Sequence, residues 1–193
     1  IGRQESLCTP HIYDLNEYIG TGVHEMTICV SNVGYKTKGG HLTSPDTQTN
    51  WNGITGRIEL IGYKNAHAEN VMLWCDIHNK TVRVTANITG GKSGKAVISA
   101  ESFNSERSHT PEVQSFEYTN GKLDALYKMG DDCLLWSEHE PNLYKLKIDI
   151  DGDVSEHIIG MREFRTEGGK FTINGEKTFL RGKHDGMIFP KTA

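Results

Sequence analysis

The sequence predicts an all-β protein built around an antiparallel β-sandwich. Three observations lead to this fold class. Apolar residues alternate with polar ones at a period of two in most segments, as in half-buried strands. Turn signals rich in Gly, Asn and Asp recur between these segments at the spacing typical of sandwiches. Helical periodicity is weak along the whole chain, and its best candidate is only a turn near residues 14–18.

Nine segments are predicted to form strands. Residues 70–78 (NVMLWCDIH) are denser in apolar side chains than the others, which predicts a strand covered on both faces, with Trp74 in the core. The remaining predicted strands are residues 24–31, 57–63, 81–89, 95–103, 143–150, 153–161, 170–173 and 177–180. Residues 36–50 and 102–110 are polar and are expected to form loops.

Three dipeptides predict tight hairpin turns. They are Asn120-Gly121, Asp151-Gly152 and Asn174-Gly175. Type I′ turns need two residues at positive φ, and Asn, Asp and Gly adopt that conformation most readily. Each dipeptide is therefore expected to connect two neighbouring antiparallel strands.

Changes in composition near residues 64–69 and 160–166 suggest domain boundaries. The middle piece, residues 65–161, has the length and the approximately seven strands of an immunoglobulin-like sandwich. It lacks the Cys-Trp-Cys spacing of antibody domains, so the expected likeness is one of architecture. A second Trp of this piece, Trp136, lies among apolar neighbours and is also expected in the core.

The charge and cysteine content exclude several classes of function. The 193-residue chain has a formal net charge of -4 and no Lys/Arg cluster, so neither nucleic acid nor an anionic membrane is expected as a partner. No apolar run is long enough to span a bilayer. The four cysteines show no CxxC spacing, so no metal site and no cofactor are expected. Cys29 and Cys75 lie in predicted strands and are interpreted as small buried hydrophobes.

Three motifs resemble glycoside hydrolase family 2, and they occur in that family's order and spacing. Residues 50–57 (NWNGITGR) are similar to the run that closes the family's sugar-binding jelly roll. Residues 135–144 (LWSEHEPNLY) resemble a run late in its immunoglobulin-like domain. Residues 160–164 (GMREF), 171–177 (FTINGEK) and 179–182 (FLRG) are similar to the passage that leads into its (β/α)₈ barrel.

The resemblance implies a layout and an activity. Residues 1–64 would be the C-terminal part of a jelly roll, residues 65–161 the sandwich, and residues 162–193 the start of the catalytic barrel. The parent protein would be a retaining, β-galactosidase-like glycosidase acting on a carbohydrate substrate through two glutamates about 5–5.5 Å apart. Those glutamates lie on later barrel strands in the family, so no glutamate of this chain is expected to be catalytic.

The polar loop of residues 39–51 is the most site-like stretch of the sequence. Asp and Asn side chains form paired hydrogen bonds with sugars. In the family, an acidic residue from this loop contacts the sugar, and Asp46 is the nearest match, with Asn50 second. The alternative is that Asp46 caps a turn after Pro45. The length of the loop favours the substrate-binding interpretation.

A second group of candidate substrate-binding residues follows the third motif. His184 and Asp185 stand where the family often has RGxNxH, at the carboxyl end of the first barrel strand, where barrel active sites lie. This sequence has Lys183 before His184 and no Asn there, which leaves the substrate contact open. His184 could equally be a loop residue bonded to backbone. Arg181 is expected to bind substrate or to form an ion pair beneath the sugar site.

The sequence leaves one alternative function open, and the short length of the jelly-roll part has a consequence for the isolated chain. The alternative is a stand-alone carbohydrate-binding or adhesion module, because a sandwich fold does not fix function. A jelly roll needs eight strands in two sheets, and about 64 residues cannot close one. In the isolated chain, residues 1–64 are expected to expose apolar faces and unpaired edges, which predicts either self-association of the chain or disorder of its first 60 residues. Localisation stays open, with a periplasmic or secreted location, directed by an upstream signal, as the expected choice for such enzymes.

Overall fold

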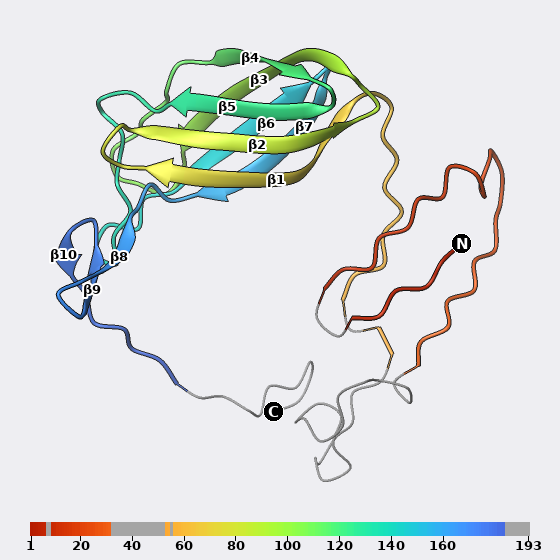
Figure 1. The fold of residues 1–193 in the computed structure, drawn as a ribbon, viewed down its shortest axis with the longest axis horizontal. Helices are drawn as coiled ribbons and strands as arrows, with labels where there is room; N and C mark the ends of the chain where they lie inside the picture. Colours follow the sequence, from red (N-terminus) through yellow and green to blue (C-terminus); the bar gives the residue numbers. More distant parts are fainter. Residues whose placement is uncertain (7–8, 32–52, 55, 184–193) are drawn as a thin grey trace, which may run out of the picture. The chain divides into compact units, whose positions relative to one another are not determined.

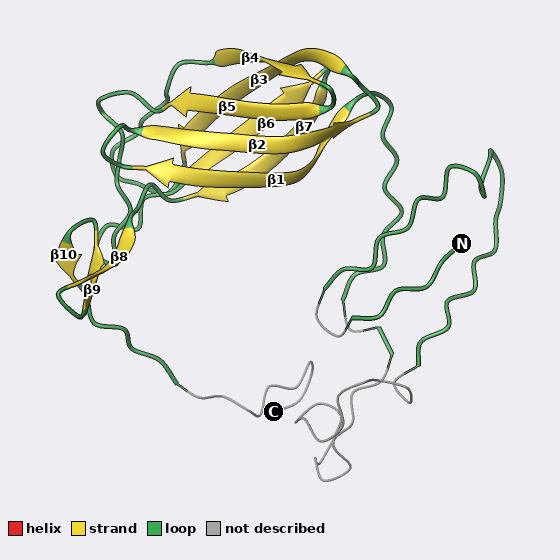
Figure 2. Ribbon diagram, in the orientation of Figure 1, coloured by secondary structure: helices red, strands yellow, loops and turns green. Residues whose placement is uncertain are grey.

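The computed structural model describes residues 1–6, 9–31, 53–54 and 56–183. The chain divides into two compact units, one containing Ile1–Glu59 and a larger one that begins at Leu60. Every strand lies in the larger unit, and the described residues contain no helix (Figure 2). The all-β prediction is thereby confirmed. Within these described ranges, accordingly, no helix is long and apolar enough to cross a membrane.

Seven antiparallel strands form the sandwich, as predicted for the middle piece. In chain order they are β1 (His67–Asp76), β2 (Thr81–Thr89), β3 (Ser93–Ser102), β4 (Gln114–Thr119), β5 (Lys122–Lys128), β6 (Tyr144–Ile150) and β7 (Asp153–Ile159). Three short strands follow as a separate sheet: β8 (Phe164–Glu167), β9 (Lys170–Ile173) and β10 (Glu176–Lys177). Figure 1 shows this small sheet at one end of the sandwich.

The seven strands make one sheet that folds over on itself, in the order β1-β2-β5-β4-β3-β6-β7. Strand β4 pairs with β3 along its whole length but with β5 only at Thr119 and Lys122, so the sheet turns at that corner. The layer β1-β2-β5 thus packs against β4-β3-β6-β7 (Figure 1). This is an immunoglobulin-like arrangement in which the fourth strand lies beside the third.

Side chains alternate along each strand, so every second side chain points into the sandwich. The inward residues of β6 are all 0% exposed, whereas the residues between them are Lys145, Lys147 and Asp149. Strands β2 and β5 show the same alternation. The inward residues of these strands form one continuous cluster, which also contains Met129, Leu134 and Met161 from outside the strands. Burying such side chains stabilises the fold by roughly 1.5–3 kcal/mol each.

The three predicted hairpin turns are confirmed. Asn120, Asp151 and Asn174 have φ of 53°, 52° and 52°, and the glycine after each also has positive φ. They connect β4 to β5, β6 to β7 and β9 to β10. The sequence pattern alone had not identified β4, β5 and β8 as strands, although Asn120-Gly121 marks the hairpin between the first two.

Two predicted strands are absent from the structure, and a third, predicted at residues 177–180, is reduced to Glu176–Lys177. Residues 24–31 and 57–63 form no strand, and their apolar side chains are exposed, as at Met26 (55%) and Leu60 (73%). A strand is stable only when a neighbouring strand pairs with its backbone. Neither segment has such a neighbour among the residues that the structure describes. Cys29 is consequently exposed and not buried as predicted.

The predicted two-sided burial of residues 70–78 is also wrong. In β1, Leu73 and Cys75 pack against the core, so the intervening Trp74 points outward and is 45% exposed. The density of apolar residues there reflects an apolar outer surface as well as a core face. Trp136 is half-buried and lies outside the core cluster, so its assignment to the core was wrong too.

A buried hydrogen-bond network fixes the start of β6. The Tyr144 hydroxyl, on a side chain that is 0% exposed, accepts a hydrogen bond from the Leu134 amide at 2.8 Å. It also lies 2.7 Å from His109 Nδ1, which can accept the hydroxyl proton when the imidazole is neutral. Burial lowers the pKa of His109, and Asp132 and Arg107 have smaller, opposite effects on it. The neutral form therefore matches the geometry.

Removing the Tyr144 hydroxyl should destabilise the sandwich. Tyr144→Phe leaves the buried Leu134 amide without its acceptor, which costs about 1–3 kcal/mol of unfolding free energy. Urea denaturation followed by circular dichroism measures the loss. The control is Tyr118→Phe, because the Tyr118 hydroxyl makes no hydrogen bond within the described residues. Equal losses in both variants would contradict the assignment.

Stability should fall as the solution becomes mildly acidic. Burial lowers the pKa of both His109 and His157 from the ordinary 6.5, so the unfolded chain binds protons more readily than the folded chain. The histidine contribution is fully present above pH 6.5 and is lost as the pH falls below it. The urea midpoint should therefore decrease from pH 7.5 to 5, and His109→Gln should reduce that decrease. A midpoint that is flat or rises over this interval would refute the prediction.

Candidate functional site

The residues of the second and third sequence motifs meet where the sandwich joins the small sheet. We call this region the junction and define it as residues 135–144, 160–164 and 171–177. Leu135 bridges Met161 in parallel fashion, and the Trp136 amide donates to the Met161 carbonyl at 2.9 Å. Segments far apart in the sequence are thereby held together by backbone contacts.

Asn174 makes three hydrogen bonds at the junction, one of which connects the small sheet to the Trp136 loop of the sandwich. Its side-chain Nδ2 donates to the Trp136 carbonyl at 2.9 Å, and its Oδ1 accepts from the Glu163 amide at 2.9 Å. Its own amide donates to the Glu163 carbonyl at 2.9 Å. An Asn at positive φ can place its amide group in this way because its short side chain tolerates that backbone conformation.

Trp136 and Arg162 stack at the surface of the junction. The Arg162 guanidinium lies 4.7 Å from the centroid of the Trp136 ring, within the range of a cation–π contact. Gly160 permits this packing, because a Cβ at that position would come within 3.0 Å of Trp136 Cβ and Cγ. Gly160 and Arg162 of the third motif therefore pack against Trp136 of the second motif.

Two further polar side chains stiffen the junction. The Glu163 carboxylate pairs with Arg165 at 2.6 Å and with His78, in the turn between β1 and β2, at 3.4 Å. Asn104 donates to the Pro141 carbonyl and accepts from the Leu143 amide, both at 2.7 Å. Residues 160–162, Asn104 and Asn174, from three separate segments, thus contact the loop of residues 135–144.

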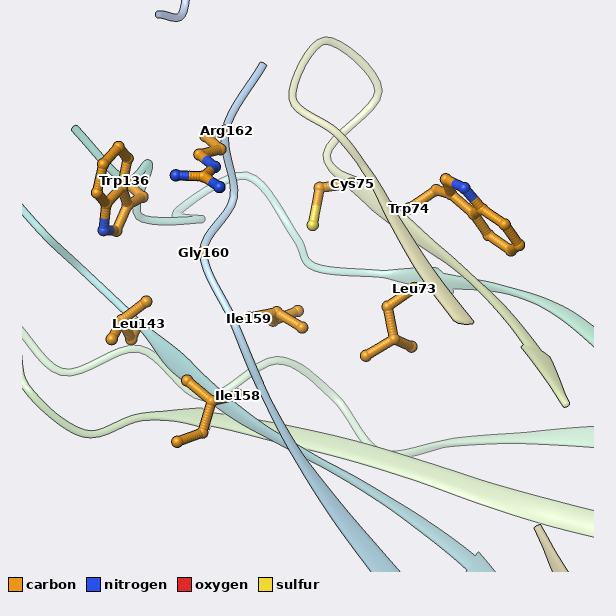
Figure 3. Close-up of a pocket in the computed structure, with 9 residues that line it drawn as sticks. All are labelled: Leu73, Trp74, Cys75, Trp136, Leu143, Ile158, Ile159, Gly160 and Arg162. Carbon is orange, nitrogen blue, oxygen red and sulfur yellow. The ribbon is translucent and has the colours of Figure 1, made fainter. Parts of the chain in front are cut away.

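A surface hollow of about 530 Å³ lies beside the junction (Figure 3). It is lined by Leu73, Trp74, Cys75, Trp136, Leu143, Ile158, Ile159, Gly160 and Arg162. None of these residues carries a carboxylate or an imidazole. Burial, followed by the nearby Cys133, raises the pKa of the Cys75 thiol to about 11, so it is protonated at neutral pH and is a poor nucleophile. The hollow therefore has neither an acid/base pair nor an activated nucleophile.

The predicted substrate-binding residues are only partly covered by the structure. Asp46, Asn50, His184 and Asp185 lie outside the described residues. Arg181 is exposed and makes no ion pair with any residue that the structure describes. The described parts of the chain also contain no group of three His, Cys, Asp or Glu residues that could hold a metal ion.

Sequence reasoning missed most of the junction. The sequence predicts only a turn at Asn174 and indicates no individual role for Arg162, Glu163 or Asn104. The available signal was the third motif, in which a hairpin dipeptide follows an Arg-Glu pair. That pattern does not reveal which backbone groups the Asn amide will reach.

Comparison with known families assigns the chain. The sequence model of glycosyl hydrolases family 2 matches residues 66–162, which cover the whole sandwich and the first residues of the junction beyond it. The chain belongs to glycosyl hydrolases family 2. The family segment therefore begins just before β1 and ends at Arg162, the residue that stacks on Trp136.

Curated relatives from this family extend the match beyond the sandwich. A β-galactosidase of Leuconostoc mesenteroides is 24% identical over 203 residues, covering 96% of this chain and 19% of the relative. A β-galactosidase of Thermoanaerobacter pseudethanolicus is 27% identical over 205 residues, covering 98% of this chain and 27% of the relative. This family 2 chain thus spans about a fifth to a quarter of the length of these enzymes.

Solved structures similar to this chain include a β-glucuronidase of Faecalibacterium prausnitzii. The likeness has a TM-score of 0.47 at 16% sequence identity and covers 61% of this chain and 18% of that chain. A β-glucuronidase of Parabacteroides merdae has a TM-score of 0.46 at 19% identity and covers 63% of this chain and 17% of that chain.

Replacing Asn174 by Asp should loosen the junction. The substitution keeps the shape of the side chain but removes the Nδ2 donor and places a carboxylate beside the Trp136 carbonyl. We expect a local loss of about 1–3 kcal/mol, seen as faster hydrogen exchange of the Glu163 and Asn174 amides. Asn120→Asp is the matched control, since it changes the same kind of turn away from the junction. Unchanged exchange in Asn174→Asp would contradict the proposed role.

Proposed function

We propose that the chain is part of a retaining, β-galactosidase-like glycosidase and acts there as scaffold and as substrate-positioning element. The observation that carries the proposal is the family match over residues 66–162, together with relatives that are β-galactosidases. The geometry supports the scaffold role, because the motif residues are used for hydrogen bonds and packing at the junction. No side chain of the hollow beside it could transfer a proton or attack a sugar at neutral pH.

The reaction of the parent enzyme would be a double displacement. One glutamate attacks the anomeric carbon and a second protonates the leaving oxygen, and water then hydrolyses the covalent glycosyl-enzyme with the second glutamate acting as base. We place both glutamates in a barrel outside this chain. The sandwich would hold the start of that barrel, residues 162–193, through Asn174 and the stacked pair of Arg162 and Trp136.

Substrate positioning is assigned to residues on both sides of the sandwich in the sequence. Asp46, with Asn50 second, would supply the hydrogen-bonding groups for the terminal sugar, as the family resemblance suggests. His184, Asp185 and Arg181 would lie at the end of the first barrel strand. The large apolar side chains exposed in residues 1–31, such as Val23 and Ile28, support the further proposal that the isolated chain self-associates.

The purified chain should not hydrolyse an aryl β-galactoside. We expect no release of nitrophenol from o-nitrophenyl β-D-galactoside above the rate in buffer, because the nucleophile and the acid are supplied elsewhere. The positive control is the Leuconostoc mesenteroides β-galactosidase, and the contamination control is the same purification from cells carrying the empty vector.

Two results would overturn the proposal. The first is hydrolysis by the chain that survives the contamination control. The second is a parent reading frame that ends near Ala193 with no barrel after it, which would favour a free-standing carbohydrate-binding module. Two glutamates on later barrel strands of that frame would instead support the glycosidase.

A further inference from the structure

The outer face of the layer β1-β2-β5 carries a second hollow, away from the core. We call it the outer hollow; it has a volume of about 380 Å³, and its lining includes Asn70, Met72, Thr85, Asn87, Lys122 and Asp124 together with the buried Ala86 and Leu123 beneath them. Small-molecule sites typically occupy roughly 300–1,000 Å³, and they combine apolar surface with a few convergent polar groups. The outer hollow has both components.

A β-bulge shapes one side of the outer hollow. The register of β1 against β2 shifts between Glu69 and Met72, and Asn70 within this interval has φ of 51°. A non-glycine residue at positive φ in the middle of a strand is uncommon, and bulges often redirect a side chain beside a functional site. The Asn70 amide is exposed and makes no hydrogen bond within the described residues. Its donor and acceptor are free for a ligand.

An apolar platform borders the polar groups. Met72 lines the outer hollow and is 55% exposed. Trp74 follows two residues later on the same face of β1 with 45% exposure; it lies beyond the outer hollow and lines the hollow beside the junction. Figure 3 shows the Trp74 ring turned away from Leu73 and Cys75, which face the interior. The Arg83 guanidinium lies 5.8 Å from the centroid of that ring. Its Nε and Nη2 donate to the two carboxylate oxygens of Asp124 at 2.9 and 2.7 Å, which fixes both side chains.

The polar groups suit a neutral ligand with many hydroxyls. Lys122 Nζ donates to Asn87 Oδ1 at 2.6 Å, which leaves two ammonium protons of Lys122 and the Asn87 NH₂ to donate elsewhere. The hydrogen bonds and charge of Arg83 lower the pKa of Asp124, so the carboxylate stays ionised and offsets one of the two positive charges of Arg83 and Lys122. Glu69, which lies opposite Asn87 in the register of β1 and β2, carries a second carboxylate on these strands. The Thr85 hydroxyl has no partner within the described residues and can donate or accept. A ligand with adjacent donors and acceptors on an apolar ring face matches this set.

We propose that the outer hollow is an accessory carbohydrate-binding site for a short, neutral, β-linked oligosaccharide. One sugar unit would pack on Met72 and bond through its hydroxyls to Asn70, Thr85, Asn87 and Lys122, and the next unit would extend along β1 onto Trp74. The choice of a sugar rests on membership of a family of glycosyl hydrolases, and not on the location of the catalytic glutamates. The site would hold a polymeric or branched substrate on the scaffold and raise its concentration near the enzyme.

Amide NMR of the full chain, titrated with lactose, tests the proposal. We expect saturable shifts of the Trp74 indole N–H and of the Asn70 and Asn87 side-chain amides, with a dissociation constant in the millimolar range. Asn70→Gly keeps the positive φ without strain and removes the amide, so it should fold and bind lactose about fivefold more weakly. Asn120→Gly is the matched control, since it makes the same change at another positive-φ Asn and should bind like the unchanged chain.

A second pair of variants tests the platform. Trp74→Ala should weaken binding, whereas Val97→Ala, at an exposed residue of β3 in the other layer, should not. Binding that is unaffected by Asn70→Gly or Trp74→Ala, or shifts that do not saturate, would refute the site. Shifts on this face that depend on protein concentration without sugar would show that it is a protein contact, which also overturns the proposal. The titration measures lactose binding and not hydrolysis, so failure of this proposal can be distinguished from failure of the proposed function.

Discussion

The structure depends on the mutual burial of the inward faces of the two layers. Each of the strands β2, β5 and β6 presents three or four buried apolar side chains on its inward side, and those of β6 are completely buried. Neither layer could bury these side chains alone, because each layer is one strand thick and its inward face needs the other layer to cover it. The corner at Asn120-Gly121 brings the layers together by passing the chain from β4 in one layer to β5 in the other.

This constraint explains why the sandwich could be predicted from the sequence and the N-terminal segments could not. In β6, the alternation of Leu146 and Ile148 with Lys145 and Lys147 specifies which face is buried, and the Asp151-Gly152 turn supplies its partner β7. Residues 24–31 alternate in a similar way, but no described strand pairs with them. Period two shows which side chains would share a face; it does not supply the neighbouring backbone that makes a strand stable.

Trp74 shows a second limit of prediction from pattern. The run from Val71 to Cys75 contains apolar residues on both faces, and burial on both faces was the natural interpretation. The structure instead places Leu73 and Cys75 toward the core and Met72 and Trp74 on the outer surface. The polar pair Glu69-Asn70 just before this run coincides with the bulge. A sequence does not distinguish an apolar surface from a core face, because the same residue types form both.

The candidate sites differ in how far sequence could predict them, for a physical reason. The motifs marked the junction because its backbone contacts require particular residues, such as Gly160 beneath Trp136 and an Asn at the positive-φ position 174. The outer hollow has no comparable motif, since its side chains come from three strands and only the register brings Asn70, Asn87 and Lys122 together. Packing at the junction can thus be inferred from local sequence, whereas a binding face assembled across strands emerges only when the sheet is known. In this chain, local sequence motifs identify the junction, where their residues hold the sandwich to the small sheet. The strand register, in contrast, creates the outer hollow on a separate face that is free to bind.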